Sequence, residues 1–128
     1  MILGLGCDIC NIERIEKVCA NFGERFMKNY YSPREREEIE ANSDAKKKIE
    51  ALAMKFAAKE AFSKALGTGF SNGLAWSEIE VLHHESGKPY LLLSGKALAM
   101  AEKMGAKNYL VSLSDDYPWA QAVVIIEN

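Results

Sequence analysis

The spacing of apolar residues predicts a strand and a helix at the start of the chain. Residues 2–9 run almost continuously apolar up to Asp8, which is typical of a strand. From about Asn11 to Phe22, apolar residues recur at helical spacing between charged ones, which predicts an amphipathic first helix. A short aromatic stretch over 26–31 follows this helix.

Two more helices are predicted before the middle of the chain. The stretch 32–35, Ser-Pro-Arg-Glu, combines an N-cap, a proline at the first helical position and a capping-box glutamate, and it opens a highly charged helix through Glu40. After a break at 42–44, a long helix runs from roughly Lys47 to Leu66. Because this helix is apolar on more than one face, we expect it to be central and packed on both sides.

The second half of the chain alternates with a period of two residues, which predicts mostly strands. It begins after a loop with three glycines, 67–73. The predicted elements are strands at 78–81 and 90–93 around a turn at 87–89, a helix from Ser94 to about Met104, and a final hairpin of 109–114 with 119–126. The order β-α-α-α-β-β-α-β-β predicts an α+β fold with a mostly antiparallel sheet packed around the long central helix.

Length and charge narrow the class of protein. The 128 residues predict one domain spanning 1–128, and 48% hydrophobic residues are ordinary for a globular protein. A net charge of −2 gives no nucleic-acid signature, and the apolar runs are too short to cross a membrane. The N-terminus lacks the basic region of a signal peptide, so we expect a cytoplasmic protein.

The three cysteines do not predict a disulfide framework, because their number is odd. Cys7 and Cys10 form one C-x-x-C pair, which invites a zinc or redox interpretation. No second pair exists, and His83-His84 lacks the spacing of metal ligands. The favoured interpretation is therefore buried or half-buried free thiols.

The most informative feature is a carboxylate on the apolar face of the long helix. At about 100° per residue, Ile49, Leu52 and Phe56 cluster on one face, and Glu60 falls within that cluster. Lys64 follows one turn later on nearly the same face. A helix that served only for packing would carry an apolar residue at position 60, so Glu60 is a candidate for a catalytic or ligand-binding role.

Asp8 and Glu60 are candidates for a magnesium site. Two carboxylates brought together from distant segments repel unless a cation joins them, and Mg²⁺ takes one or two carboxylates with water and substrate phosphate. The alternative is that Asp8 caps the helix beginning near Asn11 and that Glu60 pairs with Lys64. Spacing leaves both interpretations open.

Several cationic residues are candidates for binding phosphate or an acidic partner. Lys64 and the backbone of the glycine loop can hold a diphosphate, although Gly67 also fits a simple helix cap. The run 46–48, Lys-Lys-Lys, can reach a further phosphate or be solvated. Four cations lie between positions 14 and 28: Arg14, Lys17, Arg25 and Lys28. They form either a docking patch for an acidic protein or a solvated face of mixed charge.

The ordered set of motifs along almost the whole chain points to one family. The motifs are Gly4-x-Gly6-x-Asp8 with Arg14-Ile15, Phe26 with Ser32-Pro33-x-Glu35, the segment 56–69 (FAAKEAFSKALGTG), Gly87-Lys88-Pro89, Leu93-x-Gly95-x-Ala97, and Val111-Ser112-Leu113-Ser114 with Ala120-x-Ala122-Val123-Val124. The chain thereby resembles the holo-[acyl-carrier-protein] synthases, the small 4′-phosphopantetheinyl transferases.

This resemblance implies an activity and an assembly. Such enzymes move the phosphopantetheine arm of coenzyme A onto a serine of apo acyl carrier protein, in fatty acid biosynthesis, and release adenosine 3′,5′-bisphosphate. They need Mg²⁺ and usually work as homotrimers with active sites between subunits. The expected fold is the 4′-phosphopantetheinyl transferase fold.

The resemblance also implies residue roles. Asp8 and Glu60 would ligate Mg²⁺ on the coenzyme diphosphate, and Lys64 would neutralise the diphosphate and protonate the leaving group. Either Glu60 or a metal-bound water would take the serine proton. The expected coenzyme contacts are Lys64, Gly67, Ser63 and Lys47, and the expected carrier-docking residues are Arg14, Lys17 and Arg25.

One position departs from the family pattern. The family usually has histidine directly after the Ser-x-Ser element, near the coenzyme, whereas here Asp115 follows Ser114. Weaker coenzyme binding, a local rearrangement, or an Asp115 that points away are the possible consequences. Two rival interpretations are a non-catalytic coenzyme A or nucleotide-binding module of the same fold, and a structural interaction domain in which the charged residues merely pair.

Overall fold

Over its described residues the protein is an α+β fold of two antiparallel sheets and four α-helices, as the order of predicted elements indicated. The computed structural model describes residues 1–70 and 73–128. The strands are β1 (Ile2–Asn11), β2 (Ile79–His83), β3 (Pro89–Leu93), β4 (Asn108–Asp116) and β5 (Trp119–Glu127), and the helices are α1 (Ile12–Tyr30), α2 (Pro33–Glu40), α3 (Ala45–Leu66) and α4 (Gly95–Lys103), with a 3₁₀ turn η1 (Trp76–Glu78). Positions 71 and 72 of the predicted glycine loop lie outside the described residues.

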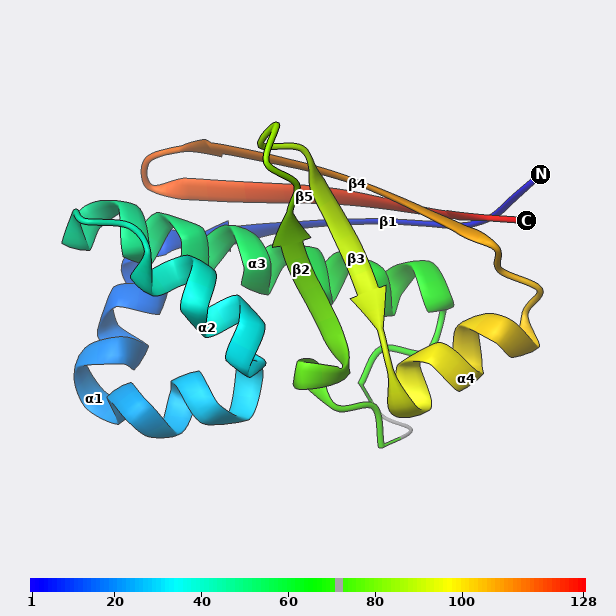
Figure 1. The fold of residues 1–128 in the computed structure, drawn as a ribbon, viewed down its shortest axis with the longest axis horizontal. Helices are drawn as coiled ribbons and strands as arrows, with labels where there is room; N and C mark the ends of the chain where they lie inside the picture. Colours follow the sequence, from blue (N-terminus) through cyan, green and yellow to red (C-terminus); the bar gives the residue numbers. More distant parts are fainter. Residues whose placement is uncertain (71–72) are drawn as a thin grey trace.

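The long helix α3 is central and packed on both sides, which confirms the prediction. The three-stranded sheet, in the order β1-β5-β4, lies along one side of α3, and the β2–β3 hairpin crosses the other side next to α1 and α2 (Figure 1). Alanines with no exposed surface, among them Ala57, Ala58 and Ala61, let the neighbouring elements approach the helix closely. The central position follows from these small residues, since larger ones would hold the sheet away.

Strand β1 approaches α3 most closely at two glycines. A Cβ atom on Gly6 would lie only 2.8 Å from the backbone nitrogen of Ala65 and would overlap the carbonyl oxygen of Ala61. A Cβ atom on Gly4 would overlap the carbonyl oxygen of Ala65. The motif Gly4-x-Gly6 therefore has a packing role, because it lets the end of β1 lie directly against the last turns of α3.

Helix α1 is longer than the predicted first helix. It continues to Tyr30 and includes the aromatic stretch that the sequence pattern had separated, but it bends at Gly23, whose φ of 27° and ψ of −106° are not helical. After the bend, Phe26 turns back into the core and is 6% exposed. The helix predicted from about Asn11 to Phe22 is therefore the part before this bend, and the aromatic stretch that the sequence pattern set apart forms a second helical part after it.

Helix α2 carries the predicted capping box and is tied to the core by it. Ser32 N–H donates to Glu35 Oε1 at 3.0 Å, and Glu35 N–H donates to Ser32 Oγ at 3.2 Å. Glu35 has no exposed surface and also accepts from Lys59 Nζ at 2.7 Å and from the N–H of Val81 at 3.0 Å. This buried ion pair joins α2 to α3 and β2.

The start of α4 differs from its prediction in one detail. Ser94 occupies the N-cap position but its hydroxyl makes no capping hydrogen bond. The carboxylate of Glu78 takes this role instead and accepts from the N–H of Lys96 at 3.0 Å. Glu78 of η1, which lies before β2 and β3 in the sequence, thus caps α4 in place of Ser94.

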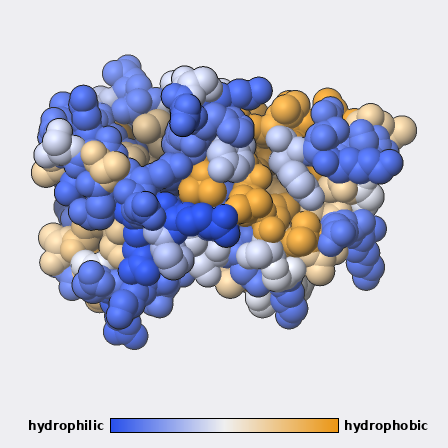
Figure 2. All heavy atoms as spheres, in the orientation of Figure 1, coloured by the Kyte–Doolittle hydropathy of each residue, from blue (hydrophilic) through white to orange (hydrophobic). Residues whose placement is uncertain are grey.

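The surface has a polar helical end and several apolar areas. In Figure 2 hydrophilic side chains cover α1 and α2, whereas apolar side chains gather along β2 and β3 and toward β4. The three-stranded sheet also exposes large apolar side chains, including Leu5, Ile9 and Trp119 at 65%, 62% and 48% exposure. Within the described part of the chain, every helix is too short or too polar to span a bilayer.

Candidate active site

Asp8 and Lys64 meet where β1 passes the last turns of α3. Lys64 Nζ donates to Asp8 Oδ1 at 3.0 Å and to the carbonyl oxygen of Cys7 at 3.1 Å. The hydrogen bond to Asp8 and the charge of Asp8 raise the pKa of Lys64, so its ammonium is kept charged. Asp8 does not cap α1, because Asn11 is the N-cap and its Oδ1 accepts from the N–H of Glu13 at 2.9 Å.

Glu60 lies one helical turn before Lys64 and is half-buried. Burial raises the pKa of Glu60, the negative charge of Asp8 raises it further, and Lys64 opposes both effects. The alternative in which Lys64 pairs with Glu60 is wrong for the described residues, since the ion pair of Lys64 is with Asp8. Glu60 is therefore a carboxylate that lacks a cation of its own within the described structure.

Asp8 and Glu60 stand at the edge of a cleft of about 760 Å³ between α1 and α3. Arg14 and Arg25 of α1 also line this cleft, which gives it a cationic border, whereas Lys17 is exposed on α1 outside the lining. The rest of the lining is largely apolar and includes Ile15, Val18, Phe22, Phe26 and Phe56. The cleft thus combines an acidic pair, two guanidinium groups and an apolar wall.

The apolar wall was not foreseen from the sequence. Phe22 is 57% exposed although it continues the apolar stripe of α1, so the stripe serves both the core and this cleft. Arg14 and Arg25, which flank the apolar stripe in the sequence, were the one indication that a cleft lies there. The sequence pattern could not locate the cleft from them, because its shape depends on the bend of the helix at Gly23.

The carboxylates of Asp8 and Glu60 are suitable ligands for a hard cation that prefers oxygen ligands. No group of three or more His, Cys, Asp or Glu side chains converges anywhere among the described residues, which argues against a closed zinc site. Two carboxylates with open space beside them match Mg²⁺, which keeps several waters and takes oxygens from a bound phosphate. Burial and then the charge of Asp8 raise the pKa of Glu60, so a cation beside the two carboxylates would favour their charged forms.

The end of α3 forms a tight cap beside the site. Gly67 has a φ of 84°, and its N–H donates to the carbonyl oxygen of Lys64 at 3.0 Å, so it is a left-handed helix cap. Ser63 is 1% exposed and its hydroxyl donates to the carbonyl oxygen of Glu60 at 2.7 Å. The N–H of Gly69 donates to the carbonyl oxygen of Ser63 at 3.2 Å. Ser63 therefore supports the loop from inside rather than offering its hydroxyl to the cleft.

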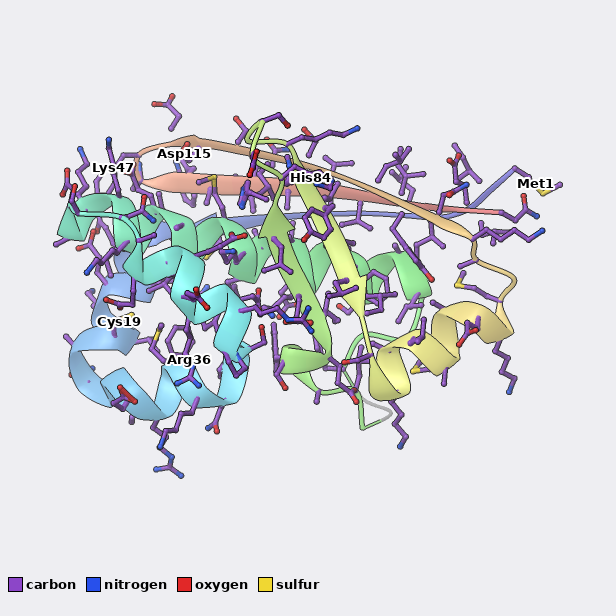
Figure 3. The ribbon with its side chains drawn as sticks, in the orientation of Figure 1. Met1, Cys19, Arg36, Lys47, His84 and Asp115 are labelled. Atoms are coloured by element: carbon purple, nitrogen blue, oxygen red, sulfur yellow. The ribbon has the colours of Figure 1, made fainter. Side chains whose placement is uncertain are left out.

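Lys47 lies at the other end of α3, away from Lys64. The 17 intervening rises of the helix place the two residues about 25 Å apart along its axis. Lys47 lines a separate cavity of about 530 Å³ together with Glu50 and Asp115. Figure 3 shows Lys47 and Asp115 at the same end of the molecule. A single chain therefore does not bring Lys47 to the acidic pair.

Asp115, the residue that departs from the family pattern, faces another carboxylate. Burial raises the pKa of Glu50, and a hydrogen bond with Asp115 and the charge of Asp115 raise it further. The acidic pair Glu50–Asp115 joins α3 to the β4–β5 hairpin and was not foreseen, because its two members are 65 positions apart.

The three cysteines are free thiols; the expected burial holds for Cys10 and Cys19 but is wrong for Cys7, which lies on the exposed face of β1. Cys7 is exposed, whereas Cys10 is 6% exposed and lies on the buried face of β1. Burial, followed by the charge of Asp8, raises the pKa of Cys10 to about 11, so this thiol stays protonated at neutral pH. Residues three apart in a strand point to opposite faces, which prevents Cys7 and Cys10 from sharing a metal.

Similarity to known proteins identifies the class to which this fold and site belong. Residues 4–122 match the model of the 4′-phosphopantetheinyl transferase superfamily, and the chain belongs to this family. A relative from Cereibacter sphaeroides, named holo-[acyl-carrier-protein] synthase, is 44% identical over 131 residues that cover 99% of this chain and 93% of the relative.

Solved structures of holo-[acyl-carrier-protein] synthases share the fold. The enzyme from Neisseria meningitidis has a TM-score of 0.88 at 34% identity, with full coverage of both chains. The enzyme from Bacillus anthracis, solved in complex with coenzyme A, has a TM-score of 0.82 at 33% identity and covers 100% of this chain and 98% of its own. The predicted family and fold are confirmed.

Proposed function

We propose that this protein transfers the 4′-phosphopantetheine group of coenzyme A to a serine of apo acyl carrier protein. The transfer gives holo acyl carrier protein and adenosine 3′,5′-bisphosphate, and serves fatty acid biosynthesis. The observation that carries the proposal is that Asp8 and Glu60 line one cleft and Lys64 donates to Asp8, in a chain that belongs to the phosphopantetheinyl transferases. Relatives over the full chain length that carry the name holo-[acyl-carrier-protein] synthase support it.

In the proposed reaction, the serine oxygen of the carrier bonds to the phosphorus that carries pantetheine. The bond from this phosphorus to the bridging oxygen of the diphosphate breaks, and adenosine 3′,5′-bisphosphate leaves. Such transfers depend mainly on positioning and on neutralising the phosphate charge. Lys64 is suited to this, because its raised pKa keeps it cationic and its Nζ already lies against Asp8. It is also the group placed to give a proton to the leaving phosphate.

Asp8 and Glu60 are the proposed ligands of Mg²⁺. When bound, Mg²⁺ would supply the positive charge that the diphosphate and the two carboxylates need. The place of both carboxylates in the lining of one cleft supports this assignment, and a divalent cation there would offset the repulsion between Asp8 and Glu60, which after burial is the second cause of the raised pKa of Glu60. Either Glu60 or a water held by the metal would accept the proton of the serine.

The cleft between α1 and α3 is the proposed docking site of the carrier. Arg14, Lys17 and Arg25 would contact the acidic surface of the carrier, and Arg14 and Arg25 already border the cleft. The apolar wall near Phe22 would receive an apolar side chain next to the modified serine. Docking through charged residues should weaken as salt is raised. An Arg14→Glu variant should raise the KM for the carrier without changing coenzyme binding.

A homotrimer with sites between subunits is proposed because one chain leaves the coenzyme contacts divided. Lys64 and Gly67 lie at one end of α3, whereas Lys47 lies at the other, about 25 Å away along the helix. A second copy that covers the apolar face of the three-stranded sheet would remove the exposed Leu5 and Ile9 from water, and a site shared between copies would let residues from both ends of α3 contact one coenzyme. Sedimentation analysis of the purified protein tests this assembly.

The function is tested by weighing the carrier. Purified protein, apo acyl carrier protein, coenzyme A and Mg²⁺ are mixed, and the carrier is examined by intact-mass spectrometry. A gain of one phosphopantetheine group that EDTA prevents would support the transferase and its metal. Unmodified carrier together with intact coenzyme A binding would instead support a non-catalytic coenzyme-binding module. Absence of both transfer and binding would overturn the proposal.

A further inference from the structure

A second polar cavity lies away from the candidate active site. It has a volume of about 440 Å³ and is formed by the end of α1, the start of α2 and the segment from η1 to β2. None of its lining residues belongs to the cleft that holds Asp8 and Glu60. Any ligand of this cavity must therefore be inferred from the residues that line it.

The lining carries an excess of positive charge in a protein of net charge −2. Three cations line the cavity: Lys28, Arg34 and Arg36. The carboxylate among the lining residues is that of Glu80, whose Oε1 accepts from Ser32 Oγ at 2.6 Å and lies 3.4 Å from Arg34 Nε. Glu80 thus balances one cation and leaves Lys28 and Arg36 without a counter-charge in the lining.

Arg36 lines this cavity and has an unsatisfied donor. Its Nε is the buried side-chain nitrogen that has no hydrogen-bond partner among the described residues. Figure 3 shows Arg36 in the angle between α1 and α2. Because Nε has almost no accessible surface, it does not itself face the cavity, and Arg36 contributes to the lining through the charge of its guanidinium group.

Neutral donors complete the set. Ser77 and Ser94, each with a hydroxyl group, also line the cavity. Arg34 in the first turn of α2 is a lining residue as well, whereas the N–H groups of Ser32 and Glu35 at this turn are occupied by the capping box. Two guanidinium groups, an ammonium and two hydroxyls match a tetrahedral oxyanion better than a planar carboxylate, because they approach from several directions.

We propose that this cavity is a second anion site, which binds a phosphate group either as the free ion or as a small monoester. Arg36 and Lys28 supply the uncompensated positive charge, and Ser77 and Ser94, which also line the cavity, would offer their hydroxyls to the phosphate oxygens. The volume of about 440 Å³ leaves room for a small organic substituent beside the phosphate. The site is separate from the proposed diphosphate contact at Lys64 and does not depend on it.

The test is a titration of the ¹⁵N-labelled protein with potassium phosphate near pH 8, against potassium chloride at the same ionic strength. Saturable shifts are expected for the amides of Lys28, Arg34, Ser77 and Ser94. Methyl phosphate in a parallel titration separates the sources: shifts from both ligands assign the site to any phosphate group, and shifts from inorganic phosphate alone assign it to the free ion. Shifts confined to Lys64 and its neighbours would overturn the proposal.

Variants make the test specific. Arg36→Gln should weaken phosphate binding at these amides by about tenfold or more, because a hydrogen bond to a charged group is lost. Lys28→Met, on a different helix, should weaken it as well, whereas Lys107→Met removes an exposed lysine outside the cavity and should not. Unchanged affinity in both Arg36→Gln and Lys28→Met would also overturn the proposal. Because Arg36 is outside the transferase site, Arg36→Gln should still modify acyl carrier protein, which separates this result from the proposed function.

Discussion

The close approach of β1 to α3 at Gly6 predicts that a single methyl group there disables the site. In Gly6→Ala the new Cβ would stand 2.8 Å from the nitrogen of Ala65 and would overlap the carbonyl oxygen of Ala61. Ordinary contacts between such atoms begin near about 3.5 Å, and the overlap with the oxygen is tighter than the contact with the nitrogen, so β1 has to move away from α3 by more than about 1 Å. Both obstacles are backbone atoms of a central helix, and neither can turn aside as a side chain would.

The displacement separates the two halves of the candidate site. Asp8 lies on β1, and its partner Lys64 lies on α3 at 3.0 Å, so a shift of this size lengthens the hydrogen bond beyond its usual range. Misplacement of catalytic groups by about 1 Å can cost roughly 100-fold in rate, which is the expected loss in kcat/KM for carrier modification. Overpacking of this kind should also lower the free energy of unfolding by about 1–3 kcal/mol.

The assay compares carrier modification with thermal unfolding. Leu91→Ala is the matched control, because Leu91 is 8% exposed on β3 outside the cleft and its truncation should cost about 2–5 kcal/mol. At a temperature where both variants are folded, the control should keep its transfer rate and Gly6→Ala should not. Normal transfer by a folded Gly6→Ala protein would refute the argument that this contact positions Asp8.

The other predictions concern charged residues. Glu60→Gln should reduce transfer by about 10²–10³-fold in the carrier assay. Its Tm at neutral pH should stay equal or rise, because the substitution removes a carboxylate whose pKa is raised in the folded state. A lowered Tm with normal transfer would contradict the proposed role of Glu60. Lys59→Met should lower the free energy of unfolding by about 3–5 kcal/mol in urea titrations, since it leaves the buried Glu35 without its partner at 2.7 Å, and Lys48→Met, which breaks an exposed pair, should cost less than about 1 kcal/mol. Asp115→Asn should raise the Tm near pH 8 and leave it unchanged near pH 4. The pKa of Glu50 is raised in the folded state, so folding stability is lost as the pH rises through that raised value, and removing the charge of Asp115 lessens the loss; equal effects at both pH values would contradict the contact.

The sequence determined the local structure because local rules govern it. The capping box at Ser32 and Glu35 formed as predicted, since both partners lie within one helical turn. The two-residue periodicity placed the strands of the second half, and the polar residue on an apolar stripe identified Glu60. The family motifs then gave the class of protein, because they mark several separate segments in a fixed order.

Tertiary structure decided which distant residues meet. Whether Lys64 pairs with Glu60 or Asp8 was open in the sequence, and the approach of β1 through Gly6 decided it in favour of Asp8. The bend at Gly23 created the cleft, and the length of α3 separated Lys47 from Lys64. These outcomes depend on how rigid elements pack against one another, and sequence periodicity records only which face of an element is buried, not which partner buries it.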